Sequence, residues 1–519
     1  MLEDLEPVRM DASDRTTCLP ATRHDVLSFI INWATRPSGD TANILWVHGL
    51  AGAGKSTIAT TVANYFHDLG RLGAFLFFDR GFPEKSHPSK VIRTLAHQLG
   101  SYDSRIGMAL SEIINKDRMI PLCALSSQFT KLIINLLSSL EVLHSQGPIL
   151  IVLDALDECG SPDERQKLLK VLAEQVKDLP SNLRFLITSR AERDIHCAFQ
   201  SVPHILPLEL RLTSTEGNQD ISAYFRYRMT AIRMKNEHLG LPADWPGREN
   251  ILELTTRAYG LFIWASTASD FIDAHNPDKR LKLLLQGDLS SGSQRALDIL
   301  YKTALECAGD WDDEDFVADF RSTVGIILVA RIPLSNSAID ELLRGLGVQP
   351  SIGIVLRLGC IFQLHPVVRV LHPSFFDFVS TRSRCDRNTW VFEPGPYHGV
   401  LGKQCLDWLE GELKENMCDL TLSANLTDEH LSEHVSYACT FWIDHICLMN
   451  ECNRSIIDQV YGFLRRHLLH WFEAMSILKQ SRGIREMLGR LLDWIMVCYH
   501  IVHVLAASPA NSFATGHVS

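Results

Sequence analysis

The sequence predicts an α/β domain built on a parallel β-sheet, followed by modules that are almost entirely helical. In the first part of the chain, apolar runs of strand length at 43–48, 74–78, 149–153, 185–188 and 204–208 alternate with segments of helical periodicity. Continuously apolar strands between helices indicate a parallel sheet covered on both faces, with ligands at the carboxyl ends of its strands. From about Thr213 onward strand signals become rare, and we expect the sheet domain to end there.

Length and composition are those of a globular protein with several cores. The chain has 519 residues, 46% of them hydrophobic and 21% charged, so we expect about three or four packed modules. The formal net charge of -11 argues against a nucleic acid as the main partner, because neutralising phosphates requires a basic face.

The acidic beginning lacks the features of a secretory signal, and the most hydrophobic tract, 495–507, is shorter than the roughly 20 apolar residues that span a bilayer. We therefore expect a cytoplasmic protein without a membrane span.

Cysteine usage is consistent with the same compartment. The 13 cysteines include no CxxC pair, which fits reduced thiols better than a disulfide framework. One cluster of histidines and cysteines could be imagined as a zinc site, but its spacings match no common ligand pattern, and we favour packing in a core. The residues of this cluster are His434, Cys439, His445, Cys447 and Cys452.

A glycine-rich loop at 49–56 carries the clearest chemical signal. Its sequence, Gly-Leu-Ala-Gly-Ala-Gly-Lys-Ser, follows a predicted strand and opens a predicted helix at 56–69. The glycines let backbone N–H groups surround phosphates, Lys55 reaches the β- and γ-phosphates, and the Ser56 hydroxyl binds Mg²⁺. The alternative is a glycine turn with a solvated lysine, which the flanking strand and helix disfavour. The predicted nucleotide-binding residues of this region are Gly49, Gly52, Ala53, Gly54, Lys55, Ser56 and Thr57.

Two further strands are predicted to end in polar residues at the same edge of the sheet. The run at 149–153 leads into Asp154, which is placed to hold Mg²⁺ directly or through water. Asp157 and Glu158 follow closely and are candidates to orient or deprotonate an attacking water molecule. The strand at 185–188 leads to Arg190, a candidate sensor of a γ-phosphate. Taken alone, these residues are also consistent with a carboxylate at the start of a loop and an arginine that caps a surface loop.

The rest of the chain is predicted to be helical apart from one hairpin. Helical spacing occurs at 25–33, 220–234, 248–274, 296–307, 316–329 and 338–344, and 400–507 reads as helical throughout. The segments 354–359 and 361–364 resemble a short hairpin, followed by an apolar segment at 367–378. A turn sequence at 37–40 predicts a helix break, and a Ser/Gly tract at 289–293 predicts a linker. Three helices with a hairpin indicate a winged-helix module.

These motifs together resemble the NACHT division of the STAND signalling ATPases. The resemblance rests on the loop at 49–56, on Asp154-Ala-Leu-Asp157-Glu158 and on the strand that ends in Arg190, and it covers most of the chain. It implies an α/β fold with a P-loop NTPase sheet of the ASCE type, followed by a helical lid, a winged helix and an all-helical C-terminal domain. The expected domains are a lead-in segment at 1–40, a NACHT domain at 41–212, a lid at 213–288, a winged helix at 294–385 and a helical domain at 386–519.

Shorter motifs extend the resemblance to fungal, mushroom-type NACHT proteins. The segment 18–23 resembles their lead-in, which implies that Arg23 lies against the adenine. The segment 370–378 resembles a winged-helix motif whose histidine binds the β-phosphate of ADP, which implies this role for His372; without the resemblance, it would read as a core residue. Residues 260–265 occupy the place of the family's Gly-x-Pro element. Two positions depart from the family pattern: Ala155 replaces a glycine, and Phe262 replaces the proline of this element, so the resemblance does not extend to an adenine contact from it.

The resemblance implies a switch that binds ATP or ADP with Mg²⁺. ADP would hold the domains closed through Lys55 and His372, and ATP would open them for self-association, with slow hydrolysis as the reset. The sequence names no protein partner, and we recognise no effector domain or repeat array. The alternatives are a conventional P-loop enzyme, such as a kinase or helicase, and a scaffold that binds nucleotide without hydrolysis. An Asn/Thr-Lys-x-Asp guanine signature is missing, which makes GTP the less favoured nucleotide.

Overall fold

The computed structural model describes residues 2–10, 12, 15–36, 42–79, 86–140, 147–212, 215–274, 276–286, 292–364, 366–416, 431–450 and 454–506. The chain divides into two compact units, Met1–Thr303 and Ala304–Ser519, and each is described by itself. The predicted break at 37–40, Cys452 and most of the predicted linker at 289–293 lie outside the described residues.

A five-stranded parallel sheet forms the centre of the first unit. Its strands lie in the order β2-β3-β4-β1-β5, and every pairing between neighbours is parallel. All five apolar runs of the sequence are confirmed as strands. β1 to β4 are almost wholly buried, as continuously apolar sequence permits, whereas β5 lies at the edge of the sheet and is mostly exposed. The strands are β1 Ile44–His48, β2 Leu72–Phe77, β3 Ile149–Asp154, β4 Leu183–Ser189 and β5 Ile205–Glu209.

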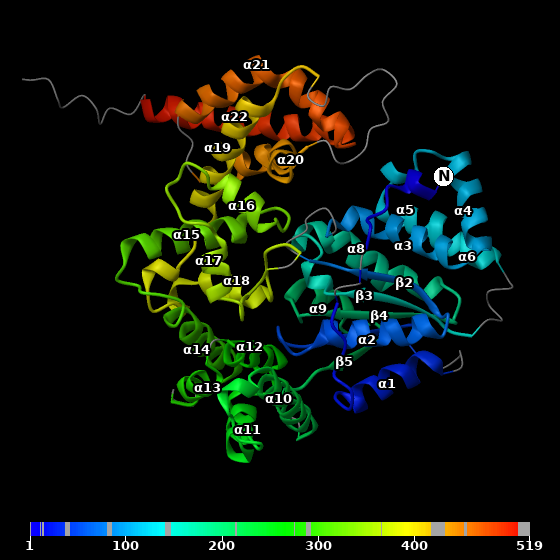
Figure 1. Ribbon diagram of the computed structural model, residues 1–519. Coiled ribbons are helices and arrows are strands. Elements are labelled where there is room, and N and C mark those ends of the chain that lie inside the picture. Colours follow the sequence, from blue (N-terminus) through cyan, green and yellow to red (C-terminus); the bar gives the residue numbers. More distant parts are fainter. Residues whose placement is uncertain are drawn as a thin grey trace, which may run out of the picture. The chain divides into compact units, whose positions relative to one another are not determined.

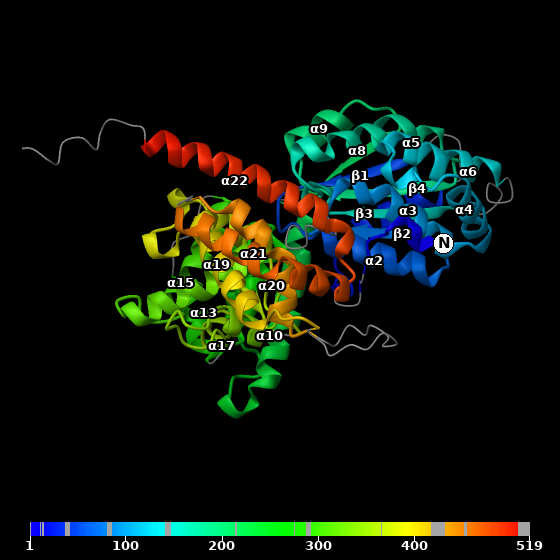
Figure 2. The same ribbon diagram turned by 90° about the horizontal axis from the view of Figure 1, so that it is seen from above.

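Helices cover both faces of this sheet, as Figures 1 and 2 show. Successive side chains of a strand point to opposite faces, so Trp46 and Leu76 belong to one core cluster while Leu45 and Phe75 belong to the other. The first cluster packs under α3 Pro88–Tyr102, α4 Ser104–Lys116, α5 Leu125–Phe129, α6 Asn135–Ser139, α8 Pro162–Gln175 and α9 Arg193–Phe199. The second packs under α1 His24–Thr35 and α2 Lys55–Asp68.

Helices alone complete the described part of this unit after β5. They are α10 Thr215–Lys235, α11 Arg248–Arg257, α12 Phe262–Ile272, α13 Pro277–Gln286 and α14 Ser293–Glu306, of which α14 runs into the second unit. The stretch 248–274, expected to be helical, is two helices, because the chain turns at Gly260. This glycine has φ +76°, and a Cβ there would lie 1.9 Å from the carbonyl oxygen of Leu212.

The second unit begins with helices and a short hairpin. Its elements are α15 Glu314–Val329, α16 Asn336–Leu342, α17 Ile352–Arg357, β6 Phe362–Gln363, β7 Arg369–Val370 and α18 Pro373–Val379. The predicted pairing of 354–359 with 361–364 is wrong. The first segment is helical because Ile354, Val355 and Leu358 are buried at helical spacing while Leu356 is 62% exposed. The antiparallel partner of β6 is instead β7, which lies in the apolar segment 367–378.

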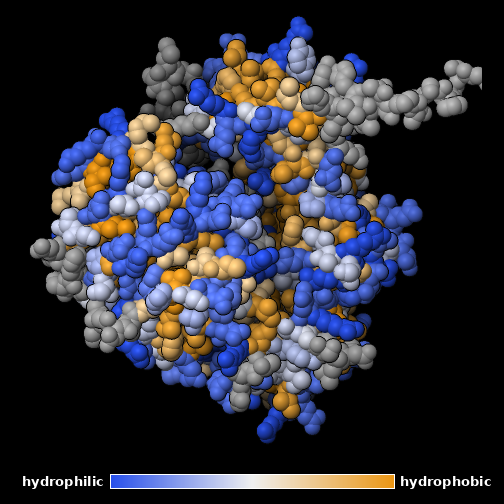
Figure 3. Space-filling view, turned by 180° about the vertical axis from the view of Figure 1, so that it is seen from behind, coloured by the Kyte–Doolittle hydropathy of each residue, from blue (hydrophilic) through white to orange (hydrophobic). Residues whose placement is uncertain are grey.

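Four long helices make up the C-terminal region. They are α19 Pro394–Glu412, α20 Glu433–Leu448, α21 Arg454–Ile477 and α22 Ile484–Ala506. Figure 3 shows hydrophobic residues gathered over these helices, whose exposed apolar side chains include Leu469, Leu492 and Val497. Among the described residues, no helix is long and apolar enough to cross a membrane.

Buried histidines connect the helices of the second unit. His445, fully buried in α20, lies 2.8 Å from the Nδ1 of His398 in α19 and 2.7 Å from the Tyr437 hydroxyl, which accepts the backbone N–H of Arg331. Both ring nitrogens of His445 thus form hydrogen bonds within a core. This agrees with the packing role that we favoured over zinc binding. The expectation of reduced thiols fits the free thiols of ten described cysteines but not Cys498, which forms a disulfide.

We expect the stability of the second unit to fall as the pH drops below 6.5. Burial, reinforced by Arg331, lowers the pKa of His398 from 6.5 to about 4, and burial holds the pKa of His445 well below 6.5. Between these pH values the unfolded chain binds protons that the folded chain does not. The stabilisation is therefore complete above pH 6.5 and decreases by up to about 1.4 kcal/mol per pH unit for each histidine.

Urea unfolding followed by tryptophan fluorescence at about pH 7.5 and about pH 5.5 measures this loss. The control is His24→Gln, which alters a side chain that is 83% exposed and should leave the pH dependence unchanged. Equal stability of the second unit at both pH values would contradict the prediction.

Candidate functional site

The glycine-rich loop connects β1 to α2 at the carboxyl end of the sheet. Gly52 and Gly54 have φ of +77° and +90°, a conformation that other residues rarely adopt. Gly54 is the N-cap of α2 and supplies no side chain, so the first N–H groups of a 14-residue helix remain directed at the loop. These groups and the helix dipole favour an anion at this position.

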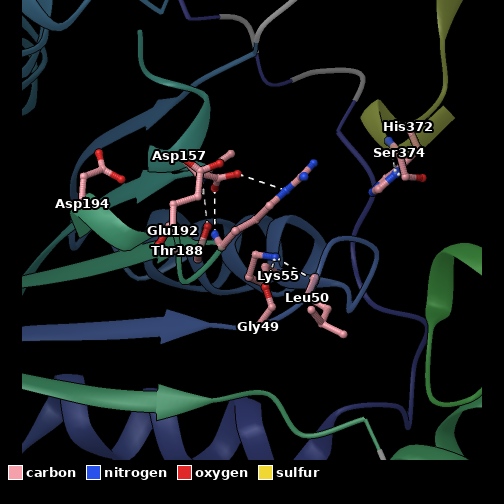
Figure 4. A network of polar contacts seen from close by, with 12 residues as sticks. Gly49, Leu50, Lys55, Asp157, Thr188, Glu192, Asp194, His372 and Ser374 are labelled. Carbon is pink, nitrogen blue, oxygen red and sulfur yellow. Dashed lines mark hydrogen bonds and ion pairs between the residues drawn. The ribbon is translucent and has the colours of Figure 1, made fainter. Parts of the chain in front are cut away.

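Lys55 is a buried cation with neutral partners. Its side chain is 9% exposed, and its Nζ donates to the carbonyl oxygens of Gly49 and Leu50, both at 2.9 Å (Figure 4). Burial lowers the pKa of Lys55, and the nearby carboxylate of Asp157 opposes this effect. Carbonyl oxygens carry no formal charge, so a neighbouring anion would stabilise this ammonium strongly.

Asp154 ends β3 and is fully buried. Its Oδ1 accepts a hydrogen bond from the Thr188 hydroxyl, which in turn accepts the backbone N–H of Ala155 at 3.0 Å. Its Oδ2 forms an ion pair with Arg15, a residue that the sequence reasoning did not single out. The predicted magnesium ligand is therefore held in place by β4 and by the lead-in segment.

The carboxylates that follow Asp154 differ in their environment. Asp157 is 3% exposed and accepts the backbone N–H of Arg190 at 2.9 Å, while the Arg190 Nε lies 3.3 Å from its second oxygen. Glu158, the neighbouring residue, is only partly buried. The structure thus brings the predicted residues Asp157 and Arg190 together as an ion pair.

Arg165 fixes the loop that carries these carboxylates, and sequence reasoning missed it. The side chain is 1% exposed, and its Nη1 donates to the carbonyl oxygen of Asp157 at 2.7 Å. The same guanidinium forms ion pairs with Glu192 and Asp194, two residues that lie after β4. A charged residue on an amphipathic helix gives no signal of such a role, because its partners lie 27 and 29 residues away.

Arg23 connects the lead-in segment to the glycine-rich loop and to α12. Its Nη2 donates to the Ala53 carbonyl oxygen at 2.7 Å, and its guanidinium lies 4.7 Å from the centre of the Phe262 ring. Burial lowers the pKa of Arg23. The next residue of α12, Ile263, donates its backbone N–H to Gly52, where an added Cβ would lie 1.9 Å from the Ile263 side chain. Phe262, which replaces the expected proline, therefore packs against the predicted adenine-contacting residue.

His372 belongs to the second unit, where it caps α18. Its Nδ1 accepts the backbone N–H of Ser374 at 3.1 Å and lies 2.7 Å from the Ser374 hydroxyl. An Nδ1 that accepts a backbone hydrogen bond carries no proton, so the proton of the neutral ring is on Nε2.

The side chains of the first unit fit a nucleoside triphosphate with Mg²⁺. The Lys55 ammonium has only carbonyl partners, and the buried Nε of Arg23 has no hydrogen-bond partner within the described residues. Ser56 follows Lys55, and its described hydrogen bond uses the carbonyl oxygen rather than the hydroxyl. Ser56 and Asp154 supply hard oxygen ligands of the kind that Mg²⁺ prefers. Thr57, beside them in α2, is partly buried.

Replacing Ala155 with glycine should stabilise the first unit slightly. Ala155 has φ +58°, a conformation that costs an L-residue about 1–2 kcal/mol, whereas glycine adopts it freely but loses about 0.5–1 kcal/mol more entropy on folding. We expect Ala155→Gly to raise the unfolding midpoint in urea by the equivalent of about 0.5–1 kcal/mol, with an unchanged m-value. The same change at Ala173, within α8, should destabilise by about 1 kcal/mol. A lower midpoint for Ala155→Gly would refute the strain argument.

A family model matches part of the first unit. Residues 25–190 match the family described as Nephrocystin 3, N-terminal. No curated protein matches the sequence of the chain. A Signal Transduction ATPase with Numerous Domains (STAND) protein with a tetratricopeptide repeat sensor, from Pyrococcus horikoshii, is similar in structure with a TM-score of 0.45 and 12% identity. The similarity covers 95% of this chain and 60% of that one, so this chain spans less than two thirds of that protein.

Two further solved structures are similar at lower TM-scores. A Cdc6 protein from Pyrobaculum aerophilum has a TM-score of 0.30 and 10% identity, over 78% of this chain and 99% of that one. An Orc1 protein from Aeropyrum pernix, in complex with DNA, has a TM-score of 0.31 and 15% identity, over 78% and 96%. The strand order, the loop after β1 and the carboxylate at the end of β3 give the first unit the fold of a P-loop ATPase.

Proposed function

We propose that the protein is an ATP- and ADP-binding signalling switch of the NACHT type. The observation that carries this proposal is the buried Lys55 ammonium, whose hydrogen-bond partners among the described residues are carbonyl oxygens of a loop shaped for phosphates. Asp154, Asp157 and Arg190 lie at the same edge of the sheet, and they supply the groups that would make the site sensitive to the third phosphate. The fungal, mushroom-type relationship and a cytoplasmic location belong to the same proposal.

Each residue of the site has a separate task in this mechanism. The N–H groups at the start of α2 and Lys55 would bind the phosphates, and Ser56 and Asp154 would hold Mg²⁺. Mg²⁺, when bound, neutralises charge on the phosphate oxygens. Glu158 would orient or deprotonate the attacking water, and Arg190, which pairs with Asp157, would contact the γ-phosphate. Arg23 would contact the base from the lead-in segment.

The switch itself requires a ligand that distinguishes two states. The added γ-phosphate meets this requirement if Arg190 contacts it and His372 contacts ADP only in the closed state. In this proposal the Nε2–H of His372 would be the donor to ADP. Opening would then permit self-association, with slow hydrolysis as the reset; the protein partners stay unnamed. The net charge of -11 still argues against a nucleic acid as partner.

Two other functions remain as alternatives. A kinase- or helicase-like enzyme would turn over ATP at rates above roughly one per second, whereas a switch would hydrolyse it far more slowly. A scaffold that binds nucleotide without hydrolysis would show no turnover at all. Steady-state release of phosphate separates these cases, and the carboxylates at Asp154 and Glu158 favour hydrolysis over the scaffold that binds nucleotide without turnover.

Lys55→Met tests nucleotide binding and the charge argument together. Because this change removes a buried cation that has neutral partners, it should raise the free energy of unfolding of the ligand-free protein by about 0–2 kcal/mol. In the wild type, MgATP at about 100 times its Kd should add about 2.7 kcal/mol of stability, and the variant should lose this gain. Differential scanning calorimetry with and without nucleotide measures both effects.

Lys170→Met is the matched control, since Lys170 is exposed on α8 and far from the loop in sequence. It should keep the response to MgATP. A wild-type protein whose melting temperature is the same with ATP, ADP and no nucleotide would rule out the proposed function.

His372→Asn tests the proposed contact of His372 with ADP without removing the N-cap of α18. Asparagine is a good N-cap residue, so α18 should stay intact while the Nε2–H donor is lost. We expect wild type to be monomeric with ADP and to self-associate with ATP, and the variant to self-associate with either nucleotide. Sedimentation velocity with each nucleotide measures this. Identical behaviour of the variant and the wild type would remove His372 from the mechanism.

A further inference from the structure

Both oxygens of the Asp154 carboxylate have partners within the protein. Thr188 donates to Oδ1, and Arg15 forms the ion pair with Oδ2. The carboxylate is fully buried, whereas the Arg15 side chain is 21% exposed. Access to Oδ2 is therefore controlled by a residue of the lead-in segment, 139 positions away in the sequence.

Several contacts hold Arg15 in this position. Its Nε donates to the Thr60 hydroxyl of α2 at 3.2 Å, and its guanidinium lies 4.4 Å from the centre of the Phe77 ring on β2. Three residues further along, the backbone N–H of Cys18 donates to Thr61 at 2.8 Å. The segment thus lies along α2, and its arginine reaches the end of β3 across the helix-covered face of the sheet.

We propose that Arg15 is a displaceable cation at the magnesium site, which must leave Asp154 before this carboxylate can hold Mg²⁺. The inference rests on the proposed function and adds the regulation of the same site. Mg²⁺ and a guanidinium cannot share one buried carboxylate oxygen, because two cations about 4 Å apart repel strongly where water is excluded. A hydrogen bond to a charged group contributes about 1.5–3 kcal/mol, so the arginine competes measurably without blocking the metal ion.

Displacement of Arg15 would also change the contacts of Arg23. The two arginines lie on the same short segment, and Arg23 contacts the Ala53 carbonyl oxygen of the glycine-rich loop and the Phe262 ring of α12. Binding of Mg²⁺ with nucleotide would therefore loosen the segment from α2 and alter its contact with the lid. This couples the metal site to a part of the chain outside the sheet.

The experiment compares Arg15→Gln with Arg9→Gln, an exposed arginine of the same segment, in the full chain. Mn²⁺ is titrated into each protein in the presence of ADP, and bound Mn²⁺ is measured by electron paramagnetic resonance. We expect Arg15→Gln to bind Mn²⁺ about tenfold more tightly than the wild type, a change of about 1.4 kcal/mol. Arg9→Gln should match the wild type, and Arg15→Lys, which keeps the charge, should fall between them.

A second measurement follows the segment itself. Hydrogen exchange of residues 15–23 should become faster in the wild type when Mg²⁺ is added to the ADP complex, and should already be fast in Arg15→Gln. Unchanged or weaker Mn²⁺ binding in Arg15→Gln, with a melting temperature like that of wild type, would overturn the inference and make Arg15 a structural or phosphate-binding residue.

Failure of this inference is distinguishable from failure of the proposed function. Binding of a fluorescent ADP analogue is measured first without metal ion, in wild type and in Lys55→Met. If the wild type binds no nucleotide, the proposed function fails. If it binds nucleotide but Mn²⁺ affinity is independent of Arg15, only the role of Arg15 is refuted.

Discussion

The position of β4 between β1 and β3 is the constraint on which the whole site depends. The register pairs Val47 with Thr188 and Leu153 with Ile187, so the ends of three strands meet at one edge of the sheet. Thr188 can therefore donate to Asp154, while the chain that follows β4 brings Arg190 to Asp157. A shift of β4 by one residue would turn these side chains to the opposite face of the sheet.

Pairing of charges explains why, in the part of the chain that the structure describes, Lys55 donates to carbonyl oxygens and to no carboxylate. The two buried carboxylates nearest to it each have an arginine, since Asp154 pairs with Arg15 and Asp157 pairs with Arg190. The lysine is left with carbonyl oxygens, an arrangement that is costly for a buried cation unless an anion approaches. An anion bound beside the glycine-rich loop would therefore stabilise the Lys55 ammonium.

The sequence allowed most of the sheet domain to be predicted, for local reasons. Strands such as 149–153 are recognisable because burial on both faces requires continuous apolar sequence, and the glycine-rich loop because its positive φ values require glycine. The hairpin prediction at 354–359 failed because short apolar runs fit helix and strand equally well until burial is known. Arg15 and Arg165 could not be found, because their partners are distant in sequence and an isolated arginine carries no pattern.

The lead-in segment carries the connection between parts of the site that are remote in sequence. Arg15 contacts the end of β3, the Cys18 backbone contacts α2, and Arg23 contacts both the glycine-rich loop and α12. Phe262 stands where the resemblance predicts a proline, and its ring packs on the Arg23 guanidinium. α12 is also joined to the glycine-rich loop by the hydrogen bond from the Ile263 backbone N–H to the Gly52 carbonyl oxygen. A ligand that changes the charge at Asp154 would therefore act on a segment that already joins the sheet, the loop and α12, and no separate relay is required for such a ligand to influence α12.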